Sequence, residues 1–380
     1  MTAIVTDVHY RMSLSIIRDL SCAGVKVITC EKAEYSSGNM PLGFFSKHSS
    51  GSHVLSDENY AEELYALCAE VSDANGEKPV LITVGADTLA RVSAEKERFC
   101  SVAGVLTPRK ETLDNFNNKV YAAKLAMECG VPVPETYSAE NAHFPCVVKP
   151  AFGEKLGLSA HERYKIVCTA EELSNAAAHF KKITGEAPII QKYLTGGALG
   201  CSVVAQDGKI LNHLCHRRIR EYPVSGGPSS CCIAIKGSEL LPHVEKMVAA
   251  SGFSGASMFE FKEDADGIAH LLEINPRVWG SYPLSRAAKS GISVSWFDAA
   301  FEAANGKKTN LEARSPKIGK KMNFALSDAM AAIGYIRKGR VLKGLGAFAD
   351  ILNPAVKDGV FEWGDFLPGI KYLFSLGSKR

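Results

Sequence analysis

The chain has 380 residues, of which 46% are apolar, which is enough to bury a sizeable core and excludes a disordered protein. Charged residues make up 22%, and the formal net charge of +3 excludes the basic excess of a protein that coats nucleic acid. The charge is unevenly spread, because residues 306–380 hold 14 basic and 6 acidic residues, or +8, against −5 for the residues before them.

The eleven cysteines are odd in number and none stands in a C-x-x-C pair, so neither a disulfide framework nor a zinc knuckle is indicated. We therefore expect a reduced, cytoplasmic protein. The first residues lack the apolar stretch and cleavage site of an export signal. No apolar run reaches the roughly 18 to 20 residues that span a bilayer, so we expect a soluble chain.

The first hundred residues alternate β-branched runs with helical patterns. A strand over residues 3–6, a helix over 13–23 and a strand over 25–29 form a β-α-β unit. A further strand over residues 80–84 leads to Asp87, which we expect to cap the next helix. These elements predict a doubly wound domain. Since the first turn lacks G-x-G-x-x-G, dinucleotide binding is not indicated.

A polar stretch near residues 108–120, followed by a helix to Cys129 and the run GVPVPET, predicts a domain junction. From about residue 305 the composition turns basic, with two weak helical patterns. Between these points we predict strands over residues 146–149, 165–168 and 188–193, helices over 170–182 and 240–251, and a hairpin over 256–275.

The turn of that hairpin is predicted at Asp266 and Gly267. A D-G pair between two alternating apolar runs is the strongest short signal for a two-residue type I′ turn. Such a turn fixes which residues of the two strands face each other. The facing pairs are Glu260 with Glu273, Phe259 with Ile274, and Phe261 with Leu272.

Glu260 and Glu273 then share one face of the hairpin with Asn275. Facing Cβ atoms lie roughly 4.5 to 5.5 Å apart, so two like charges there are destabilising unless something neutralises them. Two carboxylates and an amide oxygen form a hard oxygen site that suits Mg²⁺ together with substrate phosphates. The alternative is a solvent-exposed pair on a sheet edge, or a pair neutralised by Lys262.

Two basic features could hold anions, although no Walker A motif is present. Lys149 ends an apolar strand, where a buried ammonium needs an anionic partner, unless it is a snorkelling surface lysine. In the segment HRRIREYPVSGGPSS, Arg217, Arg218 and Arg220 could hold a carboxylate or phosphate, or form an exposed basic edge. If this segment is a strand, Arg218 and Arg220 share a face with His216.

Together these features resemble the ATP-grasp superfamily, specifically its branch similar to carbamoyl-phosphate synthetase and biotin carboxylase, over roughly residues 1–305. The motifs are NNKVYAAKLAMECGVPVPET, FPCVVKPAFG, IIQKYLTGG, and MFEFK followed by LLEINPR. The resemblance implies an α/β and α+β fold: an N-terminal doubly wound pre-ATP-grasp domain over 1–112, a two-lobed ATP-grasp domain over 113–305 with its lid lobe at about 145–193, and a basic helical C-terminal extension over 306–380.

The resemblance also implies ATP and Mg²⁺, or Mn²⁺, as cofactors. The lid loop reads FGEKLGLSAHERY where glycines and serines are usual, and the hinge has glutamine and lysine where glutamate is frequent. The resemblance implies that Lys119 and Lys149 contact the α- and β-phosphates, with Lys155 as a substitute phosphate contact in the lid. It places Gln191 near the adenine amine, and the backbone of Lys192 and Leu194 on the edge of the adenine ring. The implied metal ligands are Glu260, Glu273 and Asn275, and Arg277 would contact the transferred phosphoryl group.

The implied reaction is attack of a substrate carboxylate on the γ-phosphate, giving an acyl phosphate and ADP, followed by displacement of phosphate by an amine. Arg217, Arg218 or Arg220 would hold the carboxylate, and Glu221 and His216 are candidates for the general base. One alternative is a bicarbonate-using carboxylase or carbamoyl-forming enzyme, which would ordinarily need a biotin carrier or an ammonia source. The other is a non-catalytic nucleotide-binding partner, against which the intact set of implied ligands argues.

As partners we expect small-molecule carboxylate and amine substrates, no nucleic acid, and a homodimer as the common default for soluble enzymes. Two interpretations of the basic extension stay open. It is a solvated helical face, or it is a docking surface for an acidic substrate, a carrier or a membrane, helped by Trp363, Phe366, Tyr372 and Phe374.

Overall fold

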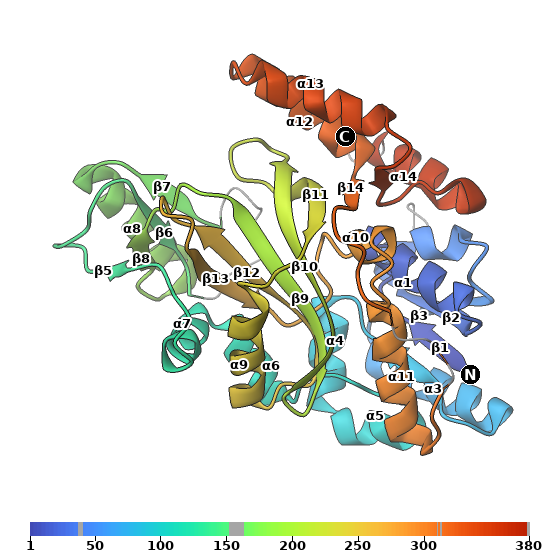
Figure 1. Ribbon diagram of the computed structural model, residues 1–380. Coiled ribbons are helices and arrows are strands. Elements are labelled where there is room, and N and C mark those ends of the chain that lie inside the picture. The colour runs from blue at the N-terminus through green and yellow to red at the C-terminus, as the bar shows by residue number, and fades with distance from the viewer. Residues whose placement is uncertain (37–40, 152–162, 310, 312–313, 378–380) are drawn as a thin grey trace.

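The computed structural model describes residues 1–36, 41–151, 163–309, 311 and 314–377. Within these residues the strands form three sheets, two of four strands and one of seven. In Figure 1 the seven-stranded sheet lies in the centre, with one four-stranded sheet on either side. Mixed α/β architecture is thereby confirmed.

The N-terminal part is a parallel sheet with helices on both faces. Its elements are β1 (Thr2–Val5), α1 (Arg11–Cys22), β2 (Lys26–Lys32), α2 (Ala33–Ser36), η1 (Leu42–Phe45), β3 (Gly51–Leu55), α3 (Tyr60–Asn75), β4 (Val80–Ile82), α4 (Ala86–Ala94) and α5 (Lys96–Val102). The strand order is β3-β2-β1-β4, and the β1–β2, β1–β4 and β2–β3 pairs are all parallel. Ala3 and Val5 pack with α1, whereas Ile4 packs with α3 and α5. This is the predicted doubly wound arrangement.

The helix after β4 begins differently from the prediction. It follows Gly85, so Asp87 lies in its first turn and does not cap it. The Asp7 carboxylate, beyond the end of β1, instead accepts hydrogen bonds from the Gly85 N–H and the Thr88 hydroxyl, each at 2.8 Å. A side chain distant in sequence therefore holds the start of this helix, whose N-cap residue Gly85 has no side chain to cap it.

The second four-stranded sheet forms a small lobe at the left of Figure 1. Its elements are β5 (Thr136–Tyr137), β6 (Cys146–Lys149), β7 (Lys165–Val167), α8 (Ala170–Thr184) and β8 (Ile189–Lys192). The order is β5-β8-β6-β7, with antiparallel pairs. Phe180 and Leu173 of α8 pack against Cys146 and Val148. The predicted strands and helix of this region are confirmed within one or two residues.

The central sheet has the order β13-β12-β9-β10-β11-β14-β15. Its strands and the helices beside it are α6 (Lys110–Asn117), α7 (Lys119–Glu128), β9 (Ala198–Gln206), β10 (Lys209–Glu221), β11 (Ser229–Ile235), α9 (Leu241–Ser251), β12 (Gly255–Glu263), β13 (Ala269–Asn275), α10 (Pro283–Ala287), α11 (Ile292–Asn305), β14 (Lys321–Asn323) and β15 (Lys357–Asp358). On β9, Cys201 and Val203 face a cluster with α6, α7 and α9, whereas Val204 faces α11 and the N-terminal sheet. One face of the sheet is therefore turned toward the N-terminal part.

The basic C-terminal segment is joined to this sheet. Its helices are α12 (Ala325–Arg337), α13 (Val341–Leu352), η3 (Trp363–Asp365) and α14 (Leu367–Gly377). β14 pairs with β11, and Met322, Phe324 and Val360 belong to the same hydrophobic cluster as the N-terminal sheet. The boundaries at residues 112 and 305 stay predictions, and this cluster spans both.

Among the helices of the described ranges, none combines the length and apolar character needed to cross a bilayer.

Candidate functional site

A row of paired positions crosses four strands of the central sheet. His216 on β10 pairs with Gly200 on β9, Gly200 with Glu260 on β12, and Glu260 with Glu273 on β13. Directly opposed residues of antiparallel strands point to the same face. The predicted facing of the two glutamates is confirmed.

The turn of this hairpin differs from the prediction. Residues 264–268 join the strands, and the Asp264 carboxylate accepts hydrogen bonds from the N–H groups of Asp266 and Ile268 at 3.0 and 2.9 Å. The loop is therefore longer than a two-residue turn. In consequence Phe261 pairs with Leu271, and the predicted pair with Leu272 is wrong.

A register shift restores the pairing of the glutamates. It falls between Glu260 and Phe261, and Leu272 is the extra residue on β13, as in a β-bulge. The Leu272 carbonyl accepts a hydrogen bond from Lys149 Nζ at 3.3 Å. The β-bulge thus aligns Glu260 with Glu273. Its extra residue, Leu272, also contacts Lys149 of the small lobe.

Two lysines from different elements meet at Glu273. Lys119 is the first residue of α7, and its Nζ lies 3.0 Å from Glu273 Oε2. Lys149 ends β6 and is buried, and burial lowers its pKa to about 8, although Glu273 and Glu260 oppose that shift while Lys119 reinforces it. A desolvated ammonium beside a second cation favours an added anion. This arrangement fits the two lysines predicted from the motifs.

The two carboxylates, Glu260 and Glu273, differ in how strongly their surroundings favour the charged form. Burial and the neighbouring Glu273 raise the pKa of Glu260. Burial acts in the same direction on Glu273, but Lys119 and Lys149 outweigh it and lower its pKa. The site therefore holds one firmly charged carboxylate and one whose charge is opposed by its surroundings.

Asn275 lies next to both carboxylates. Its Nδ2 donates to Glu260 Oε1 at 3.3 Å and to Glu273 Oε1 at 3.4 Å. A cation between the carboxylates would favour the opposite amide orientation, with the oxygen inward. No group of three or more His, Cys, Asp or Glu that could hold a metal is found among the described residues. Two carboxylates and an amide are nevertheless a donor set that suits Mg²⁺ when phosphates supply further oxygens.

The three clustered arginines have different environments. Arg217 makes two 2.7 Å hydrogen bonds to Glu263, and its side chain is 43% exposed. Arg220 is 4% exposed and lies 2.7 Å from both Asp328 and Asp350. The candidate role of Arg220 in holding a substrate carboxylate is therefore corrected, because its guanidinium joins β10 to α12 and α13.

Arg218 and Arg277 are the arginines beside the glutamates. Both counteract the raised pKa of Glu260, which places their charges near that carboxylate. Arg218 Nε donates to Ser229 Oγ at 2.9 Å, and Arg277 donates to the Val278 carbonyl at 2.9 Å. These two side chains are the arginines best placed to meet an anion at the site.

The two candidates for the general base are poorly suited to that role. Burial, reinforced by Arg218, lowers the pKa of His216 to about 4, so the imidazole is a weak base. Its ring also fills the space that a side chain at Gly200 would need, since a Cβ there would lie 2.3 Å from His216 Cε1. Glu221 lies 3.5 Å from Arg218 in an ion pair.

The hinge residues lie on β8 and just after it. Gln191 is buried and donates from Nε2 to Thr136 Oγ1 at 3.4 Å. The Lys192 N–H donates to the Glu135 carbonyl at 2.9 Å. Leu194 is buried. Lys155 lies outside the described residues.

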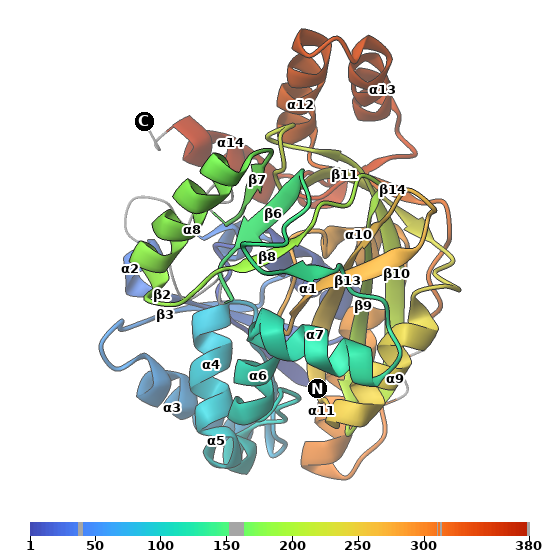
Figure 2. The same ribbon diagram turned by 90° about the vertical axis from the view of Figure 1, so that its left-hand side faces the viewer.

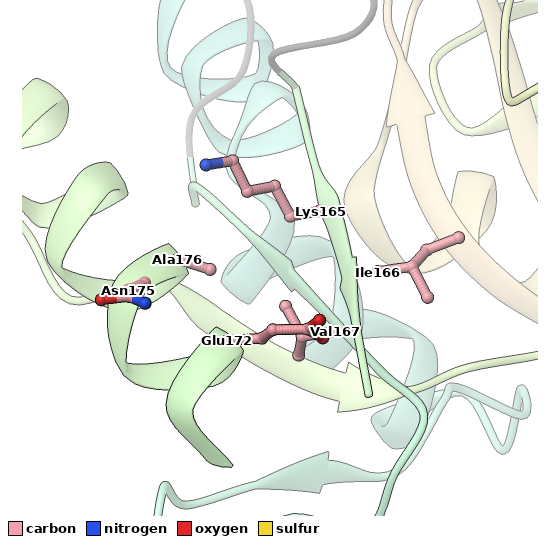
Figure 3. Close-up of a pocket in the computed structure, with 6 residues that line it drawn as sticks. All are labelled: Lys165, Ile166, Val167, Glu172, Asn175 and Ala176. Atoms are coloured by element: carbon pink, nitrogen blue, oxygen red, sulfur yellow. The ribbon is translucent and has the colours of Figure 1, made fainter. Parts of the chain in front are cut away.

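A hollow of about 330 Å³ lies elsewhere, on the small lobe (Figure 3). Its lining comes from β7 and α8 and contains none of the residues above. Glu260, Glu273 and the lysines are therefore the better candidate site, because they unite opposed charges from two lobes. The lining residues are Lys165, Ile166, Val167, Glu172, Asn175 and Ala176.

Comparison of sequences gives a distant match. No family model matches the chain. A curated relative, the carbamoyl phosphate synthase large chain of Halomonas eurihalina, is 26% identical over 261 residues. The match covers 60% of this chain and 23% of the relative, so the chain spans less than a quarter of that protein's length.

Comparison of structures decides the fold. The Campylobacter jejuni biotin carboxylase complexed with β-γ-ATP gives a TM-score of 0.64 at 16% identity, covering 84% of this chain and 74% of that one. The biotin carboxylase domain dimer of Hydrogenobacter thermophilus 2-oxoglutarate carboxylase gives 0.59 at 16%, covering 84% and 73%. The L-amino acid ligase from Bacillus licheniformis gives 0.54 at 18%, covering 83% and 77%. The chain has the ATP-grasp fold.

The predicted resemblance to the ATP-grasp branch of carbamoyl-phosphate synthetase and biotin carboxylase is thus confirmed. Lys149 lies on β6 of the small lobe, whereas Lys119, Glu260 and Glu273 lie on α7 and the central sheet. The candidate site therefore lies where the small lobe meets the central sheet. That this lobe is the predicted lid, at about residues 145–193, stays a prediction.

One cluster in this ATP-grasp chain was missed by the sequence analysis. At the carboxyl edge of the N-terminal sheet, the backbone N–H and Nδ1 of His9 lie 2.7 and 2.9 Å from Glu31 Oε2, and Glu31 is fully buried. The His9 ring stacks on Tyr35 at 4.1 Å. Glu31 is the penultimate residue of β2, and His9 lies in the turn after β1. The carboxyl ends of strands commonly line crevices in doubly wound sheets, and that position was the available signal.

Proposed function

We propose that the chain is an ATP-dependent ligase that activates a substrate carboxylate as an acyl phosphate, releases ADP, and joins the carboxylate to an amine or similar nucleophile. The observation that carries the proposal is the meeting of Lys119 and Lys149 at Glu273, directly opposite Glu260. Two cations beside two carboxylates can bind a polyphosphate and a divalent cation together. The similarity to biotin carboxylases and an L-amino acid ligase supports this proposal.

In this proposal Lys119 and Lys149 bind the phosphates of ATP. Glu260 and Glu273 would hold Mg²⁺, with Asn275 after its amide turns, and Mg²⁺ when bound neutralises the charge between the phosphates. Mg²⁺ fits this site because the two paired carboxylates repel each other, and a cation between them would remove that repulsion. Mn²⁺ has similar ligand preferences and could replace Mg²⁺.

The arginines would orient the reacting groups. Arg277 would stabilise the oxygens of the transferred phosphoryl group, and Arg218 would hold the substrate carboxylate. Fixing these two anions in line lowers the barrier, because the carboxylate must approach a negatively charged phosphate. Arg217 stays a candidate for the carboxylate only if substrate displaces Glu263.

Isotope transfer tests the reaction class. A substrate carboxylate labelled with ¹⁸O should pass one labelled oxygen to inorganic phosphate, because the acyl phosphate breaks at its carbonyl carbon. Screening carboxylates and amines for ADP release would identify the pair to use. Label in AMP would contradict the proposal and indicate adenylation.

A bicarbonate-using enzyme is the second candidate, favoured by the similarity to a biotin carboxylase domain in complex with MgADP, ADP and bicarbonate. Bicarbonate would then support ADP release with no other carboxylate present. ADP release that requires an organic carboxylate and an amine would exclude it.

We expect Lys149→Met to weaken MgADP binding by roughly 10- to 100-fold, the effect of losing a hydrogen bond to a charged group. The free energy of unfolding should be unchanged or higher, because methionine removes a buried ammonium without leaving a large void. Calorimetric titration and urea unfolding measure the two effects. Lys165→Met on the neighbouring exposed strand is the control, and equal affinity in both variants would contradict a phosphate contact at Lys149.

A further inference from the structure

The outer side of α13 carries a stripe of exposed apolar residues. Val341, Leu345, Phe348 and Leu352 recur at the three- and four-residue spacing of one helix face, and all are exposed. Leu342 beside them is 86% exposed and Leu352 83%. Isolated exposed apolar side chains are common, but a continuous stripe of this kind marks an interaction surface.

Other C-terminal elements also carry exposed apolar side chains. Trp363 in η3 is 99% exposed, and Phe366, Leu373 and Phe374 are also exposed. Met330 and Ile333 are exposed on α12. In both Figure 1 and Figure 2 the helices α12, α13 and α14 lie at the upper side of the molecule, and α12 and α13 project from it as a hairpin.

The acidic residues described within this segment are turned inward. Each already has a hydrogen-bond or ion-pair partner, which lies in the body of the protein for all of them except Asp358. Their partners are Arg220 for Asp328 and Asp350, the N–H groups of Ala325, Val360 and Phe361 for Asp358, Arg286 for Glu362, and Arg18 for Asp365.

Four basic residues of the segment, in contrast, face outward. Arg337, Lys338, Arg340 and Lys343 lie within seven positions at the tip of the hairpin, and all are exposed. They flank Leu342. The segment thus presents an apolar stripe beside a concentrated positive charge.

We propose that α12, α13 and α14 dock on an anionic lipid surface. A basic rim beside exposed leucine, phenylalanine and tryptophan is the pattern of elements that lie in a membrane interface, where cations meet the headgroups and apolar side chains enter the acyl boundary. A second copy of the chain is a poorer occupant, because pairing this face with itself would bring the two sets of cations together. The proposal does not depend on the enzymatic function.

The fluorescence of Trp363 would report docking on lipid directly. The chain has three tryptophans, and the other two, Trp279 and Trp296, are 1% and 2% exposed. A change in the emission maximum or in quenching by acrylamide therefore reports Trp363. With vesicles of phosphatidylcholine and phosphatidylglycerol we expect a blue shift and protection from acrylamide, and about 1 M salt should reverse both.

Two variants separate the contributions of charge and apolar contact. Arg337→Gln with Lys338→Gln and Arg340→Gln should reduce binding at least tenfold, and so should Leu342→Ser with Leu345→Ser. Val54→Ser is the matched control, since Val54 is an exposed apolar residue on β3, outside the segment. These exposed positions spare β14 and the buried ion pairs, which truncation of the segment would remove.

Three results would overturn the proposal. The first is unchanged Trp363 emission with anionic vesicles, or equal binding to vesicles of phosphatidylcholine alone. The second is a concentration-dependent dimer by light scattering that protects Trp363 without lipid. The third is a blue shift with an acidic carrier protein and none with vesicles.

Discussion

Glu273→Gln is expected to reduce carboxylate-dependent ADP release by roughly 10³-fold or more, because the substitution removes a proposed metal ligand and the partner of Lys119 together. The glutamine is nearly isosteric, so the hairpin should keep its shape. Steady-state ADP release measures the loss. Binding of Mn²⁺ in the presence of ADP, followed by electron paramagnetic resonance, measures the metal site separately.

Asp266→Asn is the control for this variant, since it makes the same change of carboxylate to amide at the exposed tip of the same hairpin. Its ADP release and Mn²⁺ binding should match those of the unmodified protein, and both variants should have unchanged circular dichroism. Full turnover in Glu273→Gln would contradict the assignment of the metal ligands.

Arg220→Met is expected to lower the free energy of unfolding by about 3–5 kcal/mol, the effect of breaking a buried ion pair. The substitution leaves Asp328 and Asp350 without the cation that lies 2.7 Å from each. Urea unfolding measures the change. The large effect follows from two carboxylates that stay desolvated after their partner is removed.

Arg217→Met is the matched control, because Arg217 lies three residues away on the same strand but pairs with Glu263 near the surface. An exposed pair contributes about 0–1 kcal/mol. Replacing Arg220, Asp328 and Asp350 together by Met, Leu and Leu should recover most of the lost stability. Similar losses in the two arginine variants would contradict the structural role of Arg220.

The sequence predicts the elements that local patterns define. The first strand, β1, and the apolar strand ending in Lys149 are confirmed, because both are short apolar runs that are buried in the fold. The facing of Glu260 and Glu273 is confirmed too, but the predicted turn is wrong. A longer loop and a register shift compensate each other, and neither follows from a D-G pair.

Residues whose partners are distant in sequence could not be assigned in this way. Arg220 follows two other candidate substrate arginines on the same strand, yet its partners lie 108 and 130 positions later. Asp87 has a favourable residue type for a helix cap, but Gly85 is the residue at that position, and its N–H donates to Asp7, which lies beyond the end of β1. In each case a tertiary contact overrides the local preference.

The anchoring of Arg220 has a mechanical consequence. Arg218 and Arg220 are two positions apart on β10, and the pairing of β10 with β11 is irregular between them, so one short stretch of strand joins the residue near the glutamates to the residue that holds α12 and α13. A displacement of the outer helices would therefore pull on the strand that positions Arg218. The C-terminal helices and the candidate site thus share a strand, through which a force on the helices would reach the site.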